Sequence, residues 1–139
     1  MILLLLAAAL PMVPDRAKTP GAWDSSLQYE QLCPHANTAA RRHVTDRTKK
    51  NVFRMYNVDP KTSKFEVDHL VSLQLGGTND IRNLWPQSYE TQPWNAHKKD
   101  ALETRLHTMI CHRQISVIDA QRAISTDWIA AYKKYVAPY

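Results

Sequence analysis

The sequence predicts an α+β fold, mostly helical overall, in which a two-stranded hairpin packs with flanking helices. Apolar residues recur at helical spacing both before and after the middle of the chain. Between these regions lies a run of β-branched and aromatic residues followed by a glycine-containing loop, which is typical of a hairpin. A two-stranded hairpin is not stable alone in water, so it must pack on the helices. The 139 residues suffice for one small domain.

The first predicted helix covers residues 45–56. Val52, Phe53 and Tyr56 form its apolar stripe, and Asn57 is a suitable C-terminal stop. The stripe indicates that this helix buries one face against the rest of the domain.

The hairpin is predicted from residues 65–71, which form its first strand, and residues 76–80, which form its loop. The two glycines of this loop allow backbone conformations that other residues resist. We expect a short second strand at residues 82–85. It should stop at Pro86, because proline lacks the N–H group that a strand ladder uses.

Two further helices are predicted in the C-terminal part of the chain. The first covers residues 95–111, and its apolar residues fall on one face at spacings of three and four. The second begins at a Ser116 cap, with Asp119 three residues on, and continues to Tyr135. The residues expected on the buried faces of these helices are Leu102, Leu106, Met109, Ile110, Ala120, Ala123, Ile124, Trp128, Ala131 and Tyr135.

The N-terminus begins with an apolar run, residues 2–10, that is too short to span a bilayer as a helix. It fits the apolar region of a secretory signal peptide, with small residues for a cleavage site, and the alternative is an ordinary buried helix. We expect residues 1–22 to be a signal-peptide-like segment with a linker, and residues 23–139 to form the domain. The mature protein is then exported, to the periplasm or beyond the cell, with no membrane segment.

The chain has two cysteines, Cys33 and Cys111, which we expect to form a disulfide in an oxidising compartment. Such a bond would close a long loop and stabilise a small core. Zinc binding with the nearby His35 and His112 is an alternative, although these spacings match no common zinc motif.

The formal net charge of +5 favours acidic partners, above all the phosphates of nucleic acids. Arg82, Lys98 and Lys99 are the candidates for phosphate contacts near the predicted hairpin. No element suits the reading of base edges, so low sequence specificity is expected.

The residues that carry chemistry centre on Asp68 and His69 in the first strand. A neutral imidazole can take a proton from water near pH 7, and the neighbouring carboxylate offers a hard oxygen ligand for a divalent cation. The amide of Asn83, on the returning strand, can accept the imidazole N–H and fix its tautomer. A further ligand would come from Asn95 or His97 in the first turn of the following helix. Together these groups predict hydrolysis of a phosphodiester bond.

This arrangement resembles the His-Asn-His (HNH) endonuclease family, and the resemblance covers residues 65–100. The motif pieces are Glu66-Val67-Asp68-His69-Leu70, Leu75-Gly76-Gly77, Asn83-Leu84-Trp85-Pro86 and the stretch from Asn95 to Asp100. The family shares a ββα-metal unit, a hairpin followed by a helix around one cation, and this chain is similar to its small exported bacterial members.

The resemblance implies that Asp68 is a metal ligand, that His69 is the general base and that Asn83 orients His69. The family accepts either asparagine or histidine as the ligand on the helix, so Asn95 and His97 both stay open, with a slight preference for Asn95. Glu66 either supports the metal ligands or is simply solvated.

The implied cofactor is one divalent ion, with Mg²⁺ as the default and Mn²⁺, Ni²⁺ or Zn²⁺ as options. The implied substrate is DNA, with RNA as a further option. Two other functions compete: a non-catalytic nucleic-acid-binding or structural module on the same scaffold, and a small interaction domain stabilised by a disulfide or zinc.

Overall fold

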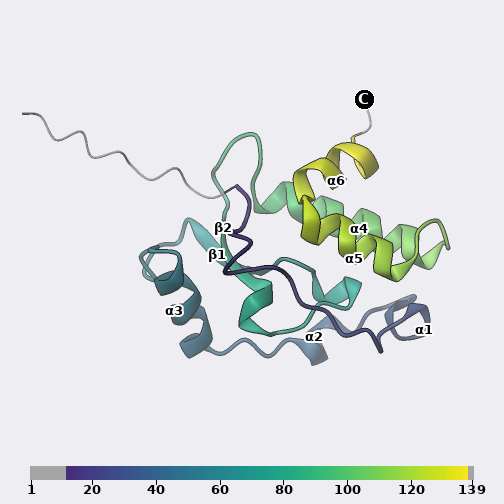
Figure 1. The fold of residues 1–139 in the computed structure, drawn as a ribbon, viewed down its shortest axis with the longest axis horizontal. Coiled ribbons are helices and arrows are strands. Elements are labelled where there is room, and N and C mark those ends of the chain that lie inside the picture. The colour runs from purple at the N-terminus through teal and green to yellow at the C-terminus, as the bar shows by residue number, and fades with distance from the viewer. Residues whose placement is uncertain (1–11, 138–139) are drawn as a thin grey trace, which may run out of the picture.

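The computed structural model describes residues 12–137 and has a mixed helix and strand architecture (Figure 1). The predicted signal-peptide run at residues 2–10 lies outside the described residues. The elements in chain order are α1 (Tyr29–Leu32), α2 (Thr38–Arg41), α3 (Asp46–Met55), β1 (Phe65–His69), η1 (Leu73–Leu75), η2 (Ile81–Asn83), β2 (Leu84–Ser88), α4 (Ala96–Cys111), α5 (Val117–Thr126) and α6 (Trp128–Tyr135).

β1 and β2 form a two-stranded antiparallel sheet in which Val67 lies opposite Pro86. The prediction that the second strand stops at Pro86 is therefore wrong. The backbone N–H of Leu70 donates to the carbonyl of Asn83 at 2.7 Å, and this pair continues the strand register by one residue. Because bonded and non-bonded pairs alternate in an antiparallel ladder, the Val67–Pro86 pair is a non-bonded one. Proline is tolerated there, since its missing N–H would point to the open edge.

α3 confirms the predicted first helix. Thr45 is its N-cap, and the Thr45 side chain accepts a hydrogen bond from the backbone N–H of Thr48 at 3.1 Å. The buried residues Val52 and Phe53 face the hairpin, so that α3 covers one side of the sheet (Figure 1).

The helices α4, α5 and α6 pack together on the other side of the hairpin and supply most of the core (Figure 1). The single helix predicted from Ser116 to Tyr135 is instead two helices. Asp127 has an extended backbone, with φ −160° and ψ 95°, and its side chain caps α6 by accepting from the N–H of Ala130. The buried apolar residues of this core are Leu32, Ala36, Val71, Leu75, Leu102, Leu106, Ile110, Val117, Ala120, Ile124, Trp128 and Ala131.

The two glycines of the predicted loop both lie where a side chain would not fit well. Gly76 has a left-handed backbone, with φ +87°, which favours glycine. A Cβ atom on Gly77 would overlap the backbone carbonyl of Val71, so only glycine fits there. The loop is thereby held against the end of β1, next to His69.

The described part of the expected linker, residues 12–22, contains no helix or strand but packs on the domain. The hydroxyl of the fully buried Thr19 donates to the carbonyl of Leu84 at 3.0 Å. The indole N–H of Trp128 donates to the carbonyl of Met12, also at 3.0 Å. This segment therefore ties the hairpin to α6.

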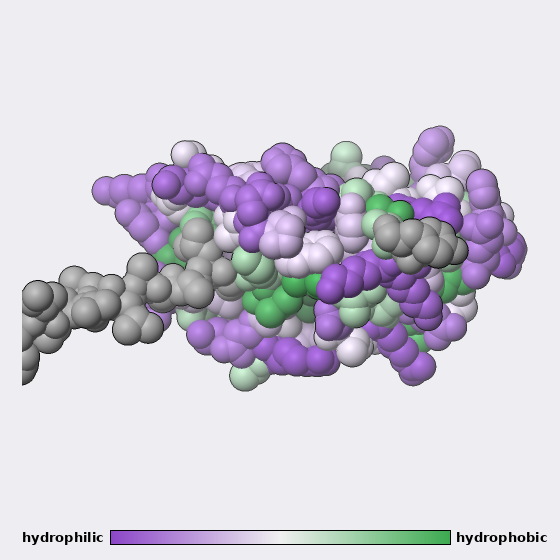
Figure 2. Space-filling model, turned by 90° about the horizontal axis from the view of Figure 1, so that it is seen from above, coloured by the Kyte–Doolittle hydropathy of each residue, from purple (hydrophilic) through white to green (hydrophobic). Residues whose placement is uncertain are grey.

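Hydrophilic residues cover much of the face shown in Figure 2, with a smaller hydrophobic patch near its middle. Within residues 12–137, no helix combines the length and the apolar character needed to cross a bilayer.

Candidate active site

A cleft of about 260 Å³ opens beside β1, between the α2 region, η1 and α4. It is strongly polar and contains four carboxylates, one imidazole and one guanidinium. The residues that line it are Thr38, Arg42, Glu66, Val67, Asp68, His69, Ser72, Leu73, Gln74, Asp100 and Glu103. The predicted pair Asp68 and His69 therefore lies in one cleft with carboxylates from α4.

His69 is held in one tautomer by Asn79. The ring nitrogen Nε2 of His69 lies 3.1 Å from Oδ1 of Asn79. Two bonds fix the direction of that amide: Nδ2 of Asn79 donates to the carbonyl of Arg41 at 2.8 Å, and Oδ1 accepts from the N–H of His43 at 3.2 Å. Nε2 must therefore carry the hydrogen, which leaves the lone pair on Nδ1.

Burial favours the neutral form of this imidazole. His69 is 3% exposed, and burial lowers the pKa of His69 below its usual 6.5 by more than the hydrogen bond with Asn79 raises it. No described residue makes a hydrogen bond to Nδ1. A neutral ring with an open nitrogen beside a polar cleft is the state that a general base requires.

Asn83 does not orient His69, so that prediction is wrong. Its Oδ1 accepts from the backbone N–H groups of Val71 and Ala22, at 2.9 and 3.2 Å. Its Nδ2 donates to the carbonyls of Val71 and Thr78, both at 2.9 Å. These bonds use the full hydrogen-bonding capacity of the side-chain amide, so none remains for an imidazole. Asn83 instead clamps the loop that carries Asn79.

Lys99 cannot serve as the predicted phosphate contact in this conformation, because its side chain is fully buried. Its ammonium donates to Oδ2 of Asp68 at 2.7 Å, to the carbonyl of His69 at 2.8 Å and to Oε1 of Glu103. These are all three of its donors. Burial alone would lower the pKa of Lys99, but the nearby charges of Asp68 and Glu103 raise it, so the ammonium stays charged. Lys99 therefore fixes the backbone and the carboxylate at the end of β1.

Asn95 does not point at the cleft. It is the N-cap of α4: its Oδ1 accepts from the N–H of Lys98 at 3.2 Å, and its Nδ2 donates to the carbonyl of Thr91 at 3.1 Å. His97 is exposed, and its ring lies 5.8 Å from that of Tyr89. Neither residue lines the cleft, so the preference for Asn95 as a ligand is not supported.

The other two predicted phosphate contacts also lie outside the cleft lining. The guanidinium of Arg82 pairs with the carboxylate of Asp80 at 2.8 Å, which lowers the pKa of Asp80 to about 2. The ammonium of Lys98 lies over the ring of Tyr132, 5.3 Å from its centroid.

The carboxylates of the cleft repel one another. Burial raises the pKa of Glu66, and the charge of Asp68 raises it further; the same two causes raise the pKa of Asp100. Glu66 accepts a hydrogen bond from the hydroxyl of Tyr89 at 2.8 Å. Oδ1 of Asp68 receives no hydrogen bond from the described residues, since Lys99 holds the other oxygen.

These oxygen donors fit a hard divalent cation in their chemistry. Their oxygens do not converge as they stand. Within residues 12–137, one group of three potential metal ligands has its ligand atoms within 4.8 Å of one another, and it lies outside the cleft. Its members are Cys33, His107 and Cys111. A cation in the cleft would therefore draw Asp68 and its neighbours together.

The predicted disulfide between Cys33 and Cys111 is present, with the two Cα atoms 5.5 Å apart. Zinc binding by these thiols in the oxidised protein, the alternative that also named His35 and His112, is therefore excluded.

A second hollow, of about 340 Å³, lies on the α3 side of β1. It shares Arg42, Glu66, Val67 and His69 with the cleft, so the two hollows meet along the strand. Its remaining lining is partly apolar and partly basic: Val44, Lys49, Phe53, Thr62 and Phe65. The exposed cations Arg42 and Lys49 both line this hollow and give it positive charge.

The structural roles of three residues in this site were not predicted from the sequence. Lys99 and Glu103 are four apart on a helix, a spacing that signals a pair on one face, but their burial could not be foreseen. Asn79 lies in the glycine loop, and no local pattern indicates that its side chain would contact His69.

In the comparisons with known proteins, no family model, no curated protein and no solved structure matches the chain. The functional assignment therefore depends on the geometry and chemistry of the cleft.

Proposed function

We propose that the protein is a metal-dependent endonuclease of the HNH type, which hydrolyses phosphodiester bonds of DNA in the cleft beside β1. The observation that carries this proposal is the state of His69: a buried neutral imidazole whose Nε2–H is held by Asn79 and whose Nδ1 is open. The order hairpin then helix, with Asp68 next to His69, supports a ββα-metal unit formed by β1, β2 and α4.

In this proposal His69 removes a proton from water at Nδ1, and the resulting hydroxide attacks phosphorus. Asn79 keeps the hydrogen on Nε2 and stabilises the imidazolium once the proton has been taken. Lys99 holds the carbonyl of His69 and one oxygen of Asp68, so it positions the base relative to the acidic group.

Oδ1 of Asp68, with the carboxylates of Glu66 or Asp100, would hold the divalent cation. Carboxylate oxygens favour Mg²⁺ or Mn²⁺, whereas Ni²⁺ or Zn²⁺ would favour an imidazole ligand, and His97 does not line the cleft. When bound, the ion supplies Lewis-acid stabilisation of the charge on the phosphate and on the leaving oxygen.

The substrate would follow β1 from the cleft into the second hollow. Arg42 lies in both hollows and Lys49 in the second, so they offer positive charge to successive phosphates. The apolar side chains of Phe53 and Phe65 line the same hollow and suit a sugar or base. This lining contacts backbone and shape rather than base edges, so sequence preference should be weak.

Export is part of the proposal. The disulfide is compatible with an oxidising compartment, such as the periplasm or the exterior of the cell.

The proposal is tested by nicking of a supercoiled plasmid with Mg²⁺ or Mn²⁺, with and without a chelator. We expect cleavage that the chelator stops and that His69→Ala abolishes. Binding to a labelled oligonucleotide and the far-UV circular dichroism spectrum should stay near those of the wild type.

His112→Ala is the matched control, because His112 is an exposed histidine just after the last turn of α4. It should cut at the wild-type rate. Cutting by His69→Ala at that rate would refute the base, and binding without any cleavage by the wild type would favour the non-catalytic module.

A further inference from the structure

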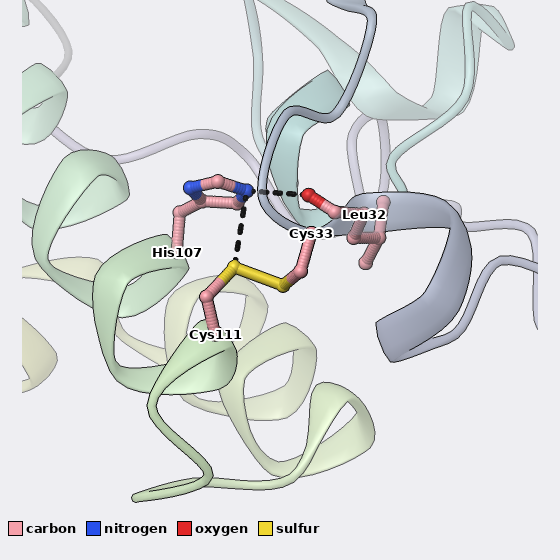
Figure 3. The surroundings of a disulfide bond; sticks show 4 residues. All are labelled: Leu32, Cys33, His107 and Cys111. Atoms are coloured by element: carbon pink, nitrogen blue, oxygen red, sulfur yellow. Dashed lines mark hydrogen bonds between the residues drawn. A yellow bond between two sulfur atoms is a disulfide. The ribbon is translucent and has the colours of Figure 1, made fainter.

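The disulfide has a histidine beside it (Figure 3). His107 lies one helical turn before Cys111 on α4, so that both side chains share one face of the helix. Nε2 of His107 is 3.6 Å from Sγ of Cys111 and 2.7 Å from the carbonyl oxygen of Leu32. Figure 3 shows the ring directed towards the sulfur from one side.

Cys33, His107 and Cys111 therefore place two sulfurs and one imidazole nitrogen within 4.8 Å of one another. Two thiolates and an imidazole form a ligand set that suits zinc, which prefers four ligands in a tetrahedron. None of the three residues lines the cleft assigned to the nuclease. All three are partly exposed, so an ion and a small reductant can reach them.

We propose that reduction of the disulfide turns this cluster into a zinc site made of Cys33, His107 and Cys111. The oxidised protein holds a covalent bond there and the reduced protein holds an ion, so α1 stays attached to α4 in both states. The proposal is independent of the proposed nuclease function.

The chemistry balances with a dithiol as reductant. The dithiol gives two electrons and two protons to the Cys33–Cys111 bond, which becomes two thiols, and the dithiol becomes a disulfide. Zinc then displaces one proton from each thiol. The hydrogen on Nε2 of His107 moves to Nδ1, and the freed lone pair binds the ion in place of the hydrogen bond to Leu32.

Space for a fourth ligand is present. A hollow of about 460 Å³ is lined by His107, and also by Pro34 and His35. Water from this hollow can complete the tetrahedron.

Cobalt(II) is a suitable probe, because bonds between cobalt and thiolate give an intense charge-transfer absorption in the near ultraviolet. The chain has two cysteines, so this absorption can arise at no other place. We expect the protein reduced with a phosphine to bind one Co²⁺ per chain with this absorption, to lose it when Zn²⁺ is added, and to show none when oxidised.

His107→Gln should weaken Co²⁺ binding by about tenfold or more, since it removes a ligand. His112→Gln, one residue beyond Cys111, is the matched control and should bind as the wild type does. Circular dichroism is recorded in parallel: if the reduced chain unfolds, Zn²⁺ should restore its helical signal. The proposal is overturned by a reduced protein without the absorption, by equal affinity in His107→Gln, or by failure of Zn²⁺ to restore an unfolded reduced chain.

Discussion

For single side chains, the proposed hydrolysis depends on the protonation of His69. A base acts only when it is neutral, so activity should fall as the pH drops through the pKa of His69 in the folded protein. Burial lowers that pKa below 6.5, and a cation bound at Asp68 would lower it further. The acidic limb of the rate profile, measured as kcat against pH, should therefore have its midpoint below pH 6.5. A midpoint well above 6.5 would contradict the buried neutral imidazole.

The same shift has a consequence for stability. Because the folded pKa of His69 is lowered, the unfolded chain binds the proton more readily as the pH falls through 6.5. This group therefore destabilises the fold at acidic pH and has no effect on stability well above pH 6.5.

Lys99 should matter more for stability than any surface lysine. Lys99→Met leaves the buried carboxylates of Asp68 and Glu103 without their cation, and breaking a buried ion pair in this way costs about 3–5 kcal/mol. Urea unfolding followed by circular dichroism measures the loss. Lys98→Met is the control, because the neighbouring lysine is exposed and should change stability by about 0.5 kcal/mol or less. Equal effects of the two substitutions would refute the buried role.

At this scale the sequence identified the pair Asp68 and His69 but not the groups around them. Asn79 lies in the glycine loop and Asn83 in η2 just after it, and either amide could have reached the imidazole. The choice depends on the path of the backbone through η2 and on which amide is used up by backbone groups, and no local pattern encodes it. Lys99 looked like a surface residue because its burial depends on how α4 meets β1.

Among the secondary-structure elements, Asn79 in the glycine loop and Asn83 at the end of η2 have separable roles. Asn83→Ala would leave buried N–H and C=O groups without partners, at about 1–3 kcal/mol each, so the total loss should reach about 3 kcal/mol. Asn79→Ala should cost less stability but reduce kcat, because His69 would lose the partner that fixes its tautomer. Chemical unfolding and plasmid nicking of both variants distinguish the roles. An unchanged kcat in Asn79→Ala would show that Asn79 does not orient the base.

Helix starts were predictable where a capping side chain precedes an apolar pattern. Ser116 acts as a cap where expected, and Thr45, the first residue of the predicted helix, is the N-cap of α3. The break at Asp127 was missed because Ile124, Trp128 and Ala131 continue the apolar spacing across it. Pro86 was wrongly predicted to end the second strand. Whether a proline interrupts a strand depends on its position in the hydrogen-bond ladder, which only the register shows.

For the whole molecule, the disulfide is the main long-range constraint. It joins residues separated by 78 positions, so replacing both cysteines with serine should lower the free energy of unfolding by about 4 kcal/mol in the loop-entropy model. Urea unfolding of the double variant, compared with the oxidised wild type, measures this. The variant also lacks the thiols that bind metal, so added zinc should not restore its stability. A loss below about 1 kcal/mol would show that the core alone holds α1 to α4.

The α+β class and the order of the main elements followed from the sequence, because hydrophobic spacing and turn residues report local structure. The arrangement of the layers could not be predicted from the sequence, because packing among distant segments determines which face of α4 meets β1. For that reason the sequence predicts Asn95 or His97 as the helix ligand beside Asp68, whereas Asp100 and Glu103 are the α4 residues that line the cleft.

The segment that runs from Met12 across the hairpin has a practical consequence for shortening the protein. Removing it up to Gly21 would take away the donors to the carbonyls of Leu84 and Arg82 and the acceptor for the indole of Trp128. A version that starts at residue 22 would thus expose a hairpin edge together with the apolar surface around Trp128, and it would be prone to aggregate. Any shorter form meant for solution work should keep its first residue at or before Met12.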